Sequence, residues 1–286
     1  MVEAQIGIIG GSGLYDMEGL TDTEEVRPRT PFGEPSDAIV IGTLQGKRVA
    51  FLPRHGKGHR INPTNIPVRA NIFALKTLGV EWVVSVSAVG SLREEIRPLD
   101  LVVPDQIIDR TKSRVNSFFE EGIAVHAAFA EPFCPDLSKT LHNVASAAGV
   151  QVHKGGTYVV IEGPLFSTRA ESELYRSWGA SVIGMTALPE AKLAREAEMC
   201  YAILACSTDY DTWHQSHEPV SVELVVKNLR KNVAVSQKIV RELVGRMPER
   251  RTCGCGQALK DAIITSREQI PPKLKEELKP LIGRYL

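Results

Sequence analysis

The sequence predicts an α/β fold, namely a three-layer α/β/α sandwich around a mixed, largely parallel β-sheet. Short apolar segments alternate with longer segments whose apolar residues recur at helical spacing, which is the pattern of βα units. A hairpin near the start of the chain makes the sheet mixed. Polar residues follow several apolar segments directly, and sheets of this class bind ligands outside the carboxyl ends of their strands.

The predicted strands are short and apolar, and most end at glycine, proline or a polar residue. Residues 38–42 and 47–52 alternate around Gln45 and Gly46 and predict the hairpin. Residues 201–206 carry no charge, which is typical of a strand buried on both faces. The other predicted strands are residues 6–9, 82–86, 100–108, 157–161 and 181–183.

The predicted helices combine an apolar face with recognisable starts and stops. Thr168 and Glu171 have the spacing of a capping box, at the start of a helix that runs to residue 178. Pro189 fits the first turn of the next helix. Residues 110–133 follow no period and predict a long structured loop, of a kind that often packs on a neighbouring subunit. The remaining predicted helices are residues 68–78, 137–148, a long amphipathic helix over 222–244, and a short last helix from residue 271.

Composition narrows the class of protein. The 286 residues are enough for one large domain or two small ones, and Lys plus Arg equals Asp plus Glu at 34 each. This balance gives no bulk charge for binding nucleic acid or an acidic membrane. No apolar run approaches the roughly 20 residues that span a bilayer, and residues 1–4 lead directly into a strand, so no signal peptide is expected. We therefore expect a soluble, cytoplasmic protein.

The chain divides into a main domain over residues 1–247 and a charged C-terminal extension over 248–286, which we expect to pack on the same domain or at a subunit interface. An odd count of five cysteines does not suit a secreted disulfide framework. Cys253 and Cys255 form a C-x-C pair in the extension. No two further ligands stand at matching spacing, so no metal site is expected. A local disulfide, a redox pair and a plain surface pair all fit.

Residues 10–13, Gly-Gly-Ser-Gly, follow the first strand, where a glycine-rich turn lets backbone N–H groups converge on an anion. A dinucleotide-binding fingerprint would need a third glycine at position 16, which is Asp16. The nicotinamide interpretation therefore fails. A loop for phosphate or another small anion, which would use Ser12, and a tight turn without a ligand both fit.

A basic loop follows the hairpin, and three basic residues and two histidines fall within residues 54–60. The planar fork of Arg54 matches phosphate, and His55 stands beside it. A solvated basic loop is the alternative interpretation. Ser87 closes another strand in a small, hydroxyl-bearing context that suits a small-molecule pocket.

Two carboxylates, Asp209 and Asp211, follow the strand over residues 201–206. Like charges this close are costly unless something requires them, and we interpret them as readers of the amino edge of a purine. A helix cap or a turn is the alternative. The carboxyl ends of four predicted strands, at Ser12, Arg54, Ser87 and Asp209, would then lie together on one rim of the sheet.

Several motifs, taken in order, closely resemble the trimeric purine nucleoside phosphorylases, and among these the group that acts on S-methyl-5'-thioadenosine. The resemblance covers about residues 4–247 and implies a nucleoside phosphorylase-like fold. It is carried by residues 8–13 (IIGGSG), 54–56 (RHG), 88–95 (AVGSLREE), 130–134 (AEPFC), 161–171 (IEGPLFSTRAE) and 208–211 (TDYD).

The resemblance implies a role for each matching residue. Phosphate would be bound by Ser12, Arg54, His55, Ser87, Ala88 and Thr186. The nucleoside would be bound by Phe166, Ser167 and Met185, by the catalytic Asp209 and Asp211, by Val222, Val225 and Val226 at its 5' end, and by His126 from a neighbouring subunit.

The implied reaction is phosphorolysis of S-methyl-5'-thioadenosine to adenine and 5-methylthio-D-ribose 1-phosphate, with adenosine as a secondary substrate. Phosphate is a co-substrate, and no cofactor or metal is needed. The resemblance to trimeric enzymes also implies a homotrimer. A homohexamer is the other possibility that it implies, because the C-x-C extension is similar to that of heat-stable, disulfide-linked hexameric relatives. A phosphorylase of 6-oxopurine nucleosides or methylthioinosine, a hydrolytic nucleosidase and a nucleoside-binding protein are the alternatives.

Overall fold

The computed structural model describes residues 4–11, 14, 17–214 and 221–286. Within them, eleven strands form one mixed sheet, in the order β2-β3-β4-β1-β5-β10-β9-β7, with β11 paired to β5 and β6, and β6 paired to β8. The strands are β1 (Ile6–Gly10), β2 (Thr21–Val26), β3 (Ile39–Leu44), β4 (Lys47–Pro53), β5 (Trp82–Ser91), β6 (Leu101–Val103), β7 (Gln106–Arg110), β8 (Val152–Lys154), β9 (Thr157–Ile161), β10 (Val182–Gly184) and β11 (Cys200–Asp209).

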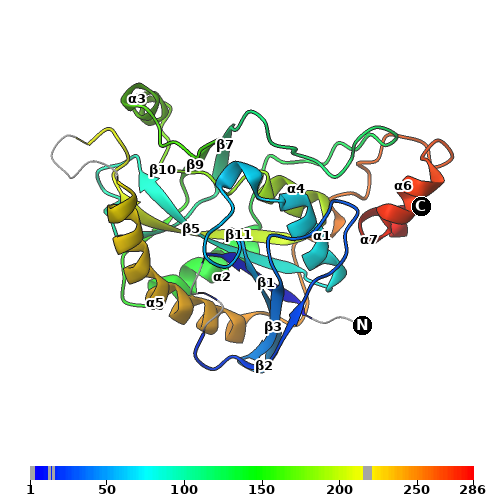
Figure 1. The fold of residues 1–286 in the computed structure, drawn as a ribbon, viewed down its shortest axis with the longest axis horizontal. Helices are drawn as coiled ribbons and strands as arrows, with labels where there is room; N and C mark the ends of the chain where they lie inside the picture. Colours follow the sequence, from blue (N-terminus) through cyan, green and yellow to red (C-terminus); the bar gives the residue numbers. More distant parts are fainter. Residues whose placement is uncertain (1–3, 12–13, 15–16, 215–220) are drawn as a thin grey trace.

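Helices cover both faces of this sheet (Figure 1), which confirms the predicted three-layer architecture. The side chains of α1 and α4 pack in one apolar cluster with Ile9, Val83 and Ile203, and those of α2 and α5 pack in a second with Ile8 and Val84. Neighbouring strand residues thus point into opposite layers. The helices are α1 (Val68–Thr77), α2 (Pro135–Ser146), α3 (Arg169–Ser177), α4 (Glu190–Glu196), α5 (Val222–Arg246), α6 (Pro272–Glu277) and α7 (Lys279–Ile282).

Most elements confirm the sequence prediction, including the hairpin β3–β4 and the capping box of Thr168 and Glu171 at the start of α3. The single strand predicted over residues 100–108 is wrong, because the chain turns between β6 and β7. β6 pairs antiparallel with β11, whereas β7 pairs parallel with β9 in another part of the sheet. The edge strand β2 was not predicted, since its polar residues are almost all exposed and carry no apolar alternation.

Two central strands are longer than their apolar cores. β5 continues to Ser91 and β11 continues to Asp209, and all ten residues of β11 are buried. The two strands pair in parallel over their length, with a register shift between Ser207 and Asp209. Polar residues at their ends therefore lie within the sheet, with strand geometry, instead of on a loop beyond it.

The C-terminal segment packs against the main domain. Leu259, Ile270 and Ile282 belong to the same buried cluster as α1 and α4, and Val125 forms an isolated bridge with Ile263. Residues 111–134, between β7 and α2, hold no helix and no longer strand, as predicted for the long loop. Among the described residues, no helix is both long and apolar enough to span a bilayer.

Candidate active site

Strands β4, β1, β5 and β11 are neighbours and run parallel, so their carboxyl ends face the same side of the sheet. Arg54 and His55 follow β4, Ser87 lies on β5, and Asp209 ends β11. The predicted convergence is present for these three strands, while Ser12 lies outside the described residues. Asp209 pairs with Gly90, three residues beyond Ser87, which corresponds to about 10 Å along the strand.

Arg54 is buried next to this rim, and its guanidinium group forms hydrogen bonds to several neighbouring groups. It forms a two-point ion pair with Glu190, with Nε to Oε2 at 3.0 Å and Nη2 to Oε1 at 3.2 Å. Nη1 also donates to the carbonyl of Val86 at 3.1 Å, and Nη2 donates to Ser85 Oγ at 2.5 Å. Arg54 therefore ties the ends of neighbouring strands together and places a buried positive charge under the rim.

Glu190 was not singled out from the sequence, yet it is the counter-ion that makes this charge tolerable. Its side chain is buried, at the start of α4, and it also accepts a 2.7 Å hydrogen bond from the hydroxyl of Tyr201. Burial raises the pKa of Tyr201 well above its ordinary value, so this hydroxyl keeps its proton and donates. The only sequence feature that could have indicated a role for Glu190 was its position directly after Pro189, on a helix with a buried face.

His55 is buried beside Arg54 and stacks on His59, with ring centroids 4.1 Å apart. Burial, and then the Arg54 charge, lower the pKa of His55 to about 4, so the imidazole is neutral near pH 7. Its Nδ1 lies 2.8 Å from the carbonyl of Ile61, and a carbonyl can only accept, so Nδ1 carries the proton. Nε2 is then an acceptor, suited to a protonated oxygen of phosphate.

Ser87 offers an unused hydroxyl at the same rim. Its Oγ is buried and has no hydrogen-bond partner within the described part of the chain, and the same holds for the hydroxyl of Tyr158. Thr186 and Ala88 are half-buried, and Ala88 directly follows Ser87 on β5. Gly184 permits this packing, because a Cβ there would stand 2.2 Å from the Tyr158 hydroxyl oxygen. Buried hydroxyls without partners are expected where a polar ligand supplies the missing bonds.

Asp209 and Asp211 are the buried acids of the site, with exposed fractions of 4% and 7%. Burial raises the pKa of both carboxyl groups, and for Asp209 the neighbouring charge of Asp211 raises it further. Asp209 Oδ2 lies 2.7 Å from Thr208 Oγ1, which in turn is 3.2 Å from the carbonyl of Val89. A protonated Asp209 could donate to Thr208 while Thr208 donates to that carbonyl.

Asp211 is held in place by its own partners. The hydroxyl of Ser167 lies 2.9 and 2.8 Å from its two carboxyl oxygens, which brings the loop after β9 against the end of β11. Its φ of 49° places it in the left-handed region, and its backbone N–H donates to Asp209 Oδ1 at 2.8 Å. Gly90 faces the pair, and a Cβ there would meet Asp209 Oδ1 at 3.0 Å. Ser167 thus lies against Asp211, while the adjacent Phe166 is 42% exposed.

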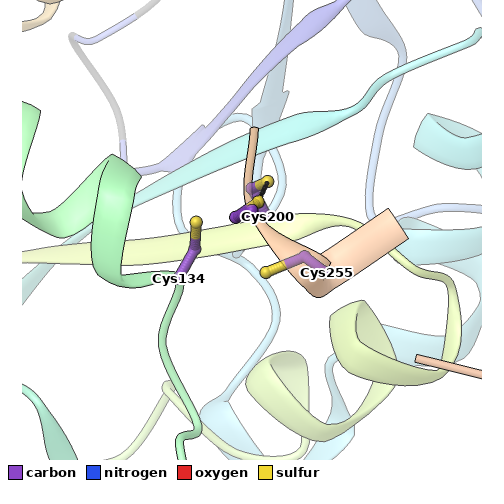
Figure 2. A group of neighbouring side chains, drawn as sticks. Cys134, Cys200 and Cys255 are labelled. Carbon is purple, nitrogen blue, oxygen red and sulfur yellow. Dashed lines mark hydrogen bonds between the residues drawn. The ribbon is translucent and has the colours of Figure 1, made fainter. Parts of the chain in front are cut away.

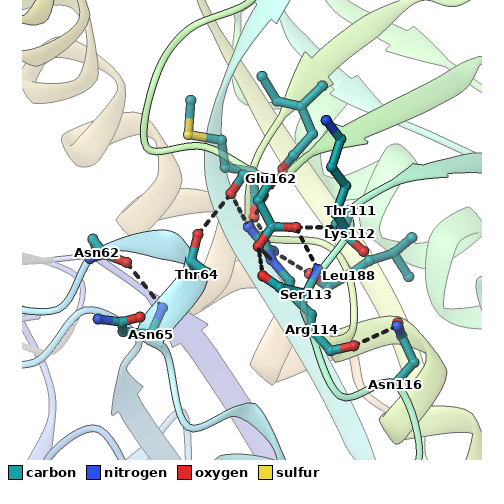
Figure 3. A network of polar contacts seen from close by, with 12 residues as sticks. Asn62, Thr64, Asn65, Thr111, Lys112, Ser113, Arg114, Asn116, Glu162 and Leu188 are labelled. Carbon is teal, nitrogen blue, oxygen red and sulfur yellow. Dashed lines mark hydrogen bonds and ion pairs between the residues drawn. The ribbon is translucent and has the colours of Figure 1, made fainter.

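Arg114 organises the loop that carries Met185 and Thr186 (Figure 3). Its Nη1 donates to the carbonyls of Met185 and Leu188, both at 2.6 Å, and its Nη2 reaches the carbonyl of Glu162. The Glu162 carboxylate in turn accepts from Ser113 Oγ at 2.9 Å. Arg114 lies in the loop without hydrophobic periodicity, so no sequence pattern predicted this positioning role.

Val222 is 68% exposed and Val226 is 38% exposed, at the start of α5. Asn228, on the same helix, donates to the carbonyl of Thr208 at 2.8 Å, so this part of α5 packs against the end of β11. His126 is also exposed, on a segment whose backbone N–H donates to the carbonyl of Ala262. Figure 1 places the first turns of α5 and the C-terminal helices at opposite ends of the molecule.

Comparison with known proteins agrees with this architecture. The profile of the phosphorylase superfamily matches residues 5–245. The chain belongs to the phosphorylase superfamily, and it is an enzyme, as the sequence predicts.

Its relatives narrow the class further. An S-methyl-5'-thioadenosine phosphorylase of Chloroflexus aurantiacus is 59% identical over 286 residues, covering 100% of this chain and 99% of that protein. One of Koribacter versatilis is 57% identical over 284 residues, covering 99% and 97%. The crystal structure of a methylthioadenosine phosphorylase from an antarctic soil metagenomic library has a TM-score of 0.94 and 49% identity, covering 98% and 99%. One from Schistosoma mansoni, solved in complex with adenine, has a TM-score of 0.82 and 36% identity, covering 90% and 96%.

Proposed function

We propose that this enzyme cleaves S-methyl-5'-thioadenosine with inorganic phosphate and releases adenine and 5-methylthio-D-ribose 1-phosphate. The observation that carries the proposal is the pair of buried acids at the end of β11, on the same side of the sheet as Arg54, His55 and Ser87. Such a site offers one region for an anion and another for a base. The activity of the relatives supports the same assignment.

The anion region accounts for the nucleophile. The unpartnered hydroxyl of Ser87 and the neutral His55 would bind phosphate, together with Ser12, Thr186 and the backbone at Ala88. Arg54, whose guanidinium is paired with Glu190, would add positive potential for an anion at this place. Phosphate held beneath C1' is oriented for attack, which converts a bimolecular encounter into an almost unimolecular step.

Bond cleavage leaves negative charge on the departing base. The C1'–N9 electron pair moves into the purine while a phosphate oxygen forms the new bond to C1'. Asp209 fits the role of proton donor to N7, because its raised pKa favours the protonated acid. Asp211, which Ser167 holds, would accept a hydrogen bond from the 6-amino group. Met185 would pack under the ribose and Phe166 would line the base pocket.

The 5' end of the nucleoside would rest on Val222, Val225 and Val226. Val222 and Val226 are exposed and Val225 is half-buried on the first turns of α5, and a methylthio group is apolar like these side chains. We propose that a homotrimer or homohexamer completes this end, with His126 reaching the pocket of a neighbouring subunit, because His126 is exposed on a segment that packs on the C-terminal part of its own chain.

The proposal is tested by measuring base release from methylthioadenosine, adenosine, inosine and methylthioinosine side by side, with and without phosphate. We expect methylthioadenosine to have the highest kcat/KM, and release to fall to background without phosphate. Release that persists without phosphate would identify a hydrolase. A preference for inosine or methylthioinosine would identify a 6-oxopurine phosphorylase, and no release from any of the four would leave a binding protein.

The preference at the 5' end depends on the apolar character of Val222. We expect Val222→His to narrow the kcat/KM gap between adenosine and methylthioadenosine by about two- to tenfold, because one added hydrogen bond to the 5'-hydroxyl contributes about 0.5–1.5 kcal/mol. Glu223→His is the matched control, since it places the same side chain one residue further along α5. An unchanged ratio in Val222→His, or an equal change in the control, would contradict the assignment of Val222.

A further inference from the structure

Four of the five cysteines meet at one place in the fold, away from the proposed active site. Cys134, Cys200, Cys253 and Cys255 have sulfur atoms that all lie within 4.8 Å of one another. They come from three segments that are distant in the sequence, namely the start of α2, the start of β11 and the C-terminal segment (Figure 2). The sequence predicted no further ligands for the C-x-C pair. The other two cysteines, Cys134 and Cys200, stand at no regular spacing from it and come close only in the folded chain.

The geometry of this cluster matches four-coordinate binding of a metal. A tetrahedral zinc–thiolate site has Zn–S bonds of about 2.3 Å, so its sulfur atoms stand about 3.8 Å apart. The cluster spans this value, from 3.2 Å between Cys200 and Cys253 to the limit of 4.8 Å. A small adjustment of side-chain torsions would make the distances equal.

The surroundings suit a buried group of thiolates. The backbone N–H of Leu137 donates to Cys134 Sγ at 3.5 Å, as a cap of α2, and Arg195 Nη1 lies 3.9 Å from Cys255 Sγ. The backbone N–H places a partial positive charge, and Arg195 a full positive charge, beside a sulfur atom of the cluster. Such contacts from outside the ligand set are common around metal-bound thiolates. Cys134, Cys200 and Cys255 are buried and Cys253 is half-buried, so the plain surface pair is wrong.

We propose that these four cysteines form a structural site for zinc or a similarly thiophilic divalent metal. Four protein ligands leave no open position, which is the arrangement of a structural site and not of a catalytic one. The cluster lies at the amino end of β11, whereas Asp209 lies at its carboxyl end, about 30 Å away along the strand. The metal would fasten the C-terminal segment to the base of the sheet and take no part in the reaction.

The first experiment measures metal and thiols in the intact protein. The protein is produced in zinc-supplemented medium, purified anaerobically without added reductant and passed over a chelating resin. We expect about one zinc per chain and five titratable thiols after denaturation with a chelator, the number of cysteines in the chain. Cobalt exchanged for zinc should give the visible bands of a tetrahedral thiolate complex. Five thiols without metal, or one or three thiols because disulfides have formed, would overturn the proposal.

Variants test the assignment of the ligands. Cys134→Ser and Cys255→Ser should each lose the bound zinc and lower Tm by about 10 °C, with kcat/KM at 25 °C within twofold of the parent. Cys206→Ser is the matched control, because Cys206 is buried and free on the same strand but does not belong to the cluster. The control should keep one zinc per chain. Zinc loss in the control, or full zinc retention in both cluster variants, would overturn the assignment, and the metal content of the parent tests the site even if a variant does not fold.

Discussion

Replacement of Asp209 by asparagine is expected to lower kcat/KM for methylthioadenosine by about 10²–10⁴-fold, because the variant removes the acid that would protonate N7. The loss should be smaller for inosine, since the asparagine amide donates to a 6-keto oxygen and the carboxylate repels it. The kcat/KM ratio of inosine to methylthioadenosine should therefore rise. Steady-state kinetics with both nucleosides at saturating phosphate measure this ratio.

The same variant separates activity from stability. The pKa of Asp209 is raised in the folded protein, primarily by burial, so the folded state binds more protons than the unfolded state over the interval between the two pKa values. Wild-type stability then falls as pH rises through this interval, and asparagine has no such dependence. We expect Asp209→Asn to have the higher Tm at neutral pH, with the difference vanishing as the pH falls below the ordinary value of an aspartate.

Asp22→Asn is the matched control, because Asp22 is an exposed residue of β2 with a positive φ that asparagine tolerates. This control should change neither the kinetics nor the pH dependence of Tm. If Asp209→Asn loses activity on methylthioadenosine with no relative gain on inosine, Asp209 is not the acid that reads and protonates the purine. A lower Tm in this variant at neutral pH would mean that the buried carboxyl group is not a source of instability.

Replacement of Glu190 by glutamine should cause the largest loss of stability. Glutamine keeps an acceptor for Tyr201 but leaves the Arg54 charge buried without a counter-ion, because both side chains of the pair are only 2% exposed. Breaking a buried ion pair by removing one partner costs about 3–5 kcal/mol of unfolding free energy. Phosphorolysis should also fall, since Arg54 positions the carbonyl of Val86 at the rim. Denaturant unfolding measures the first effect.

Two controls isolate the ion pair. Glu242→Gln makes the same change at an exposed position of α5 and should leave the midpoint of unfolding unchanged. The double variant Arg54→Met with Glu190→Gln removes both charges and should recover most of the lost stability, while phosphorolysis stays low. A single variant as stable as the parent would show that the Arg54 charge is compensated elsewhere, and a double variant no more stable than the single one would contradict the ion-pair explanation.

Strand periodicity and the residues at strand ends were sufficient to predict the sheet, both helical layers and the rim that gathers Arg54, Ser87 and Asp209. These features depend on short-range patterns, because apolar alternation and glycine turns act over a few residues. The acids were predicted as a pair beyond the strand over residues 201–206. Asp209 instead belongs to β11, since an aspartate carries no strand signal even when it continues a buried strand, and Asp211 lies in the turn that follows.

Partners that come from distant segments could not be predicted. Glu190, Arg114 and Ser167 each act through a contact with a residue 44 or more positions away, in the pairs with Arg54, Met185 and Asp211. The four cysteines likewise meet only after folding. Such contacts depend on the order and direction of the strands in the sheet. The spacing of residues along the chain does not determine that order.

β11 is anchored at both ends, which restricts how this protein can evolve. Cys200 at the first position belongs to the cysteine cluster, and Asp209 at the last position belongs to the pair of acids. Deleting or inserting one residue between them would move every later side chain to the other face of the sheet and turn Asp209 into the opposite layer. Surface loops tolerate changes in length far better than this doubly anchored strand would.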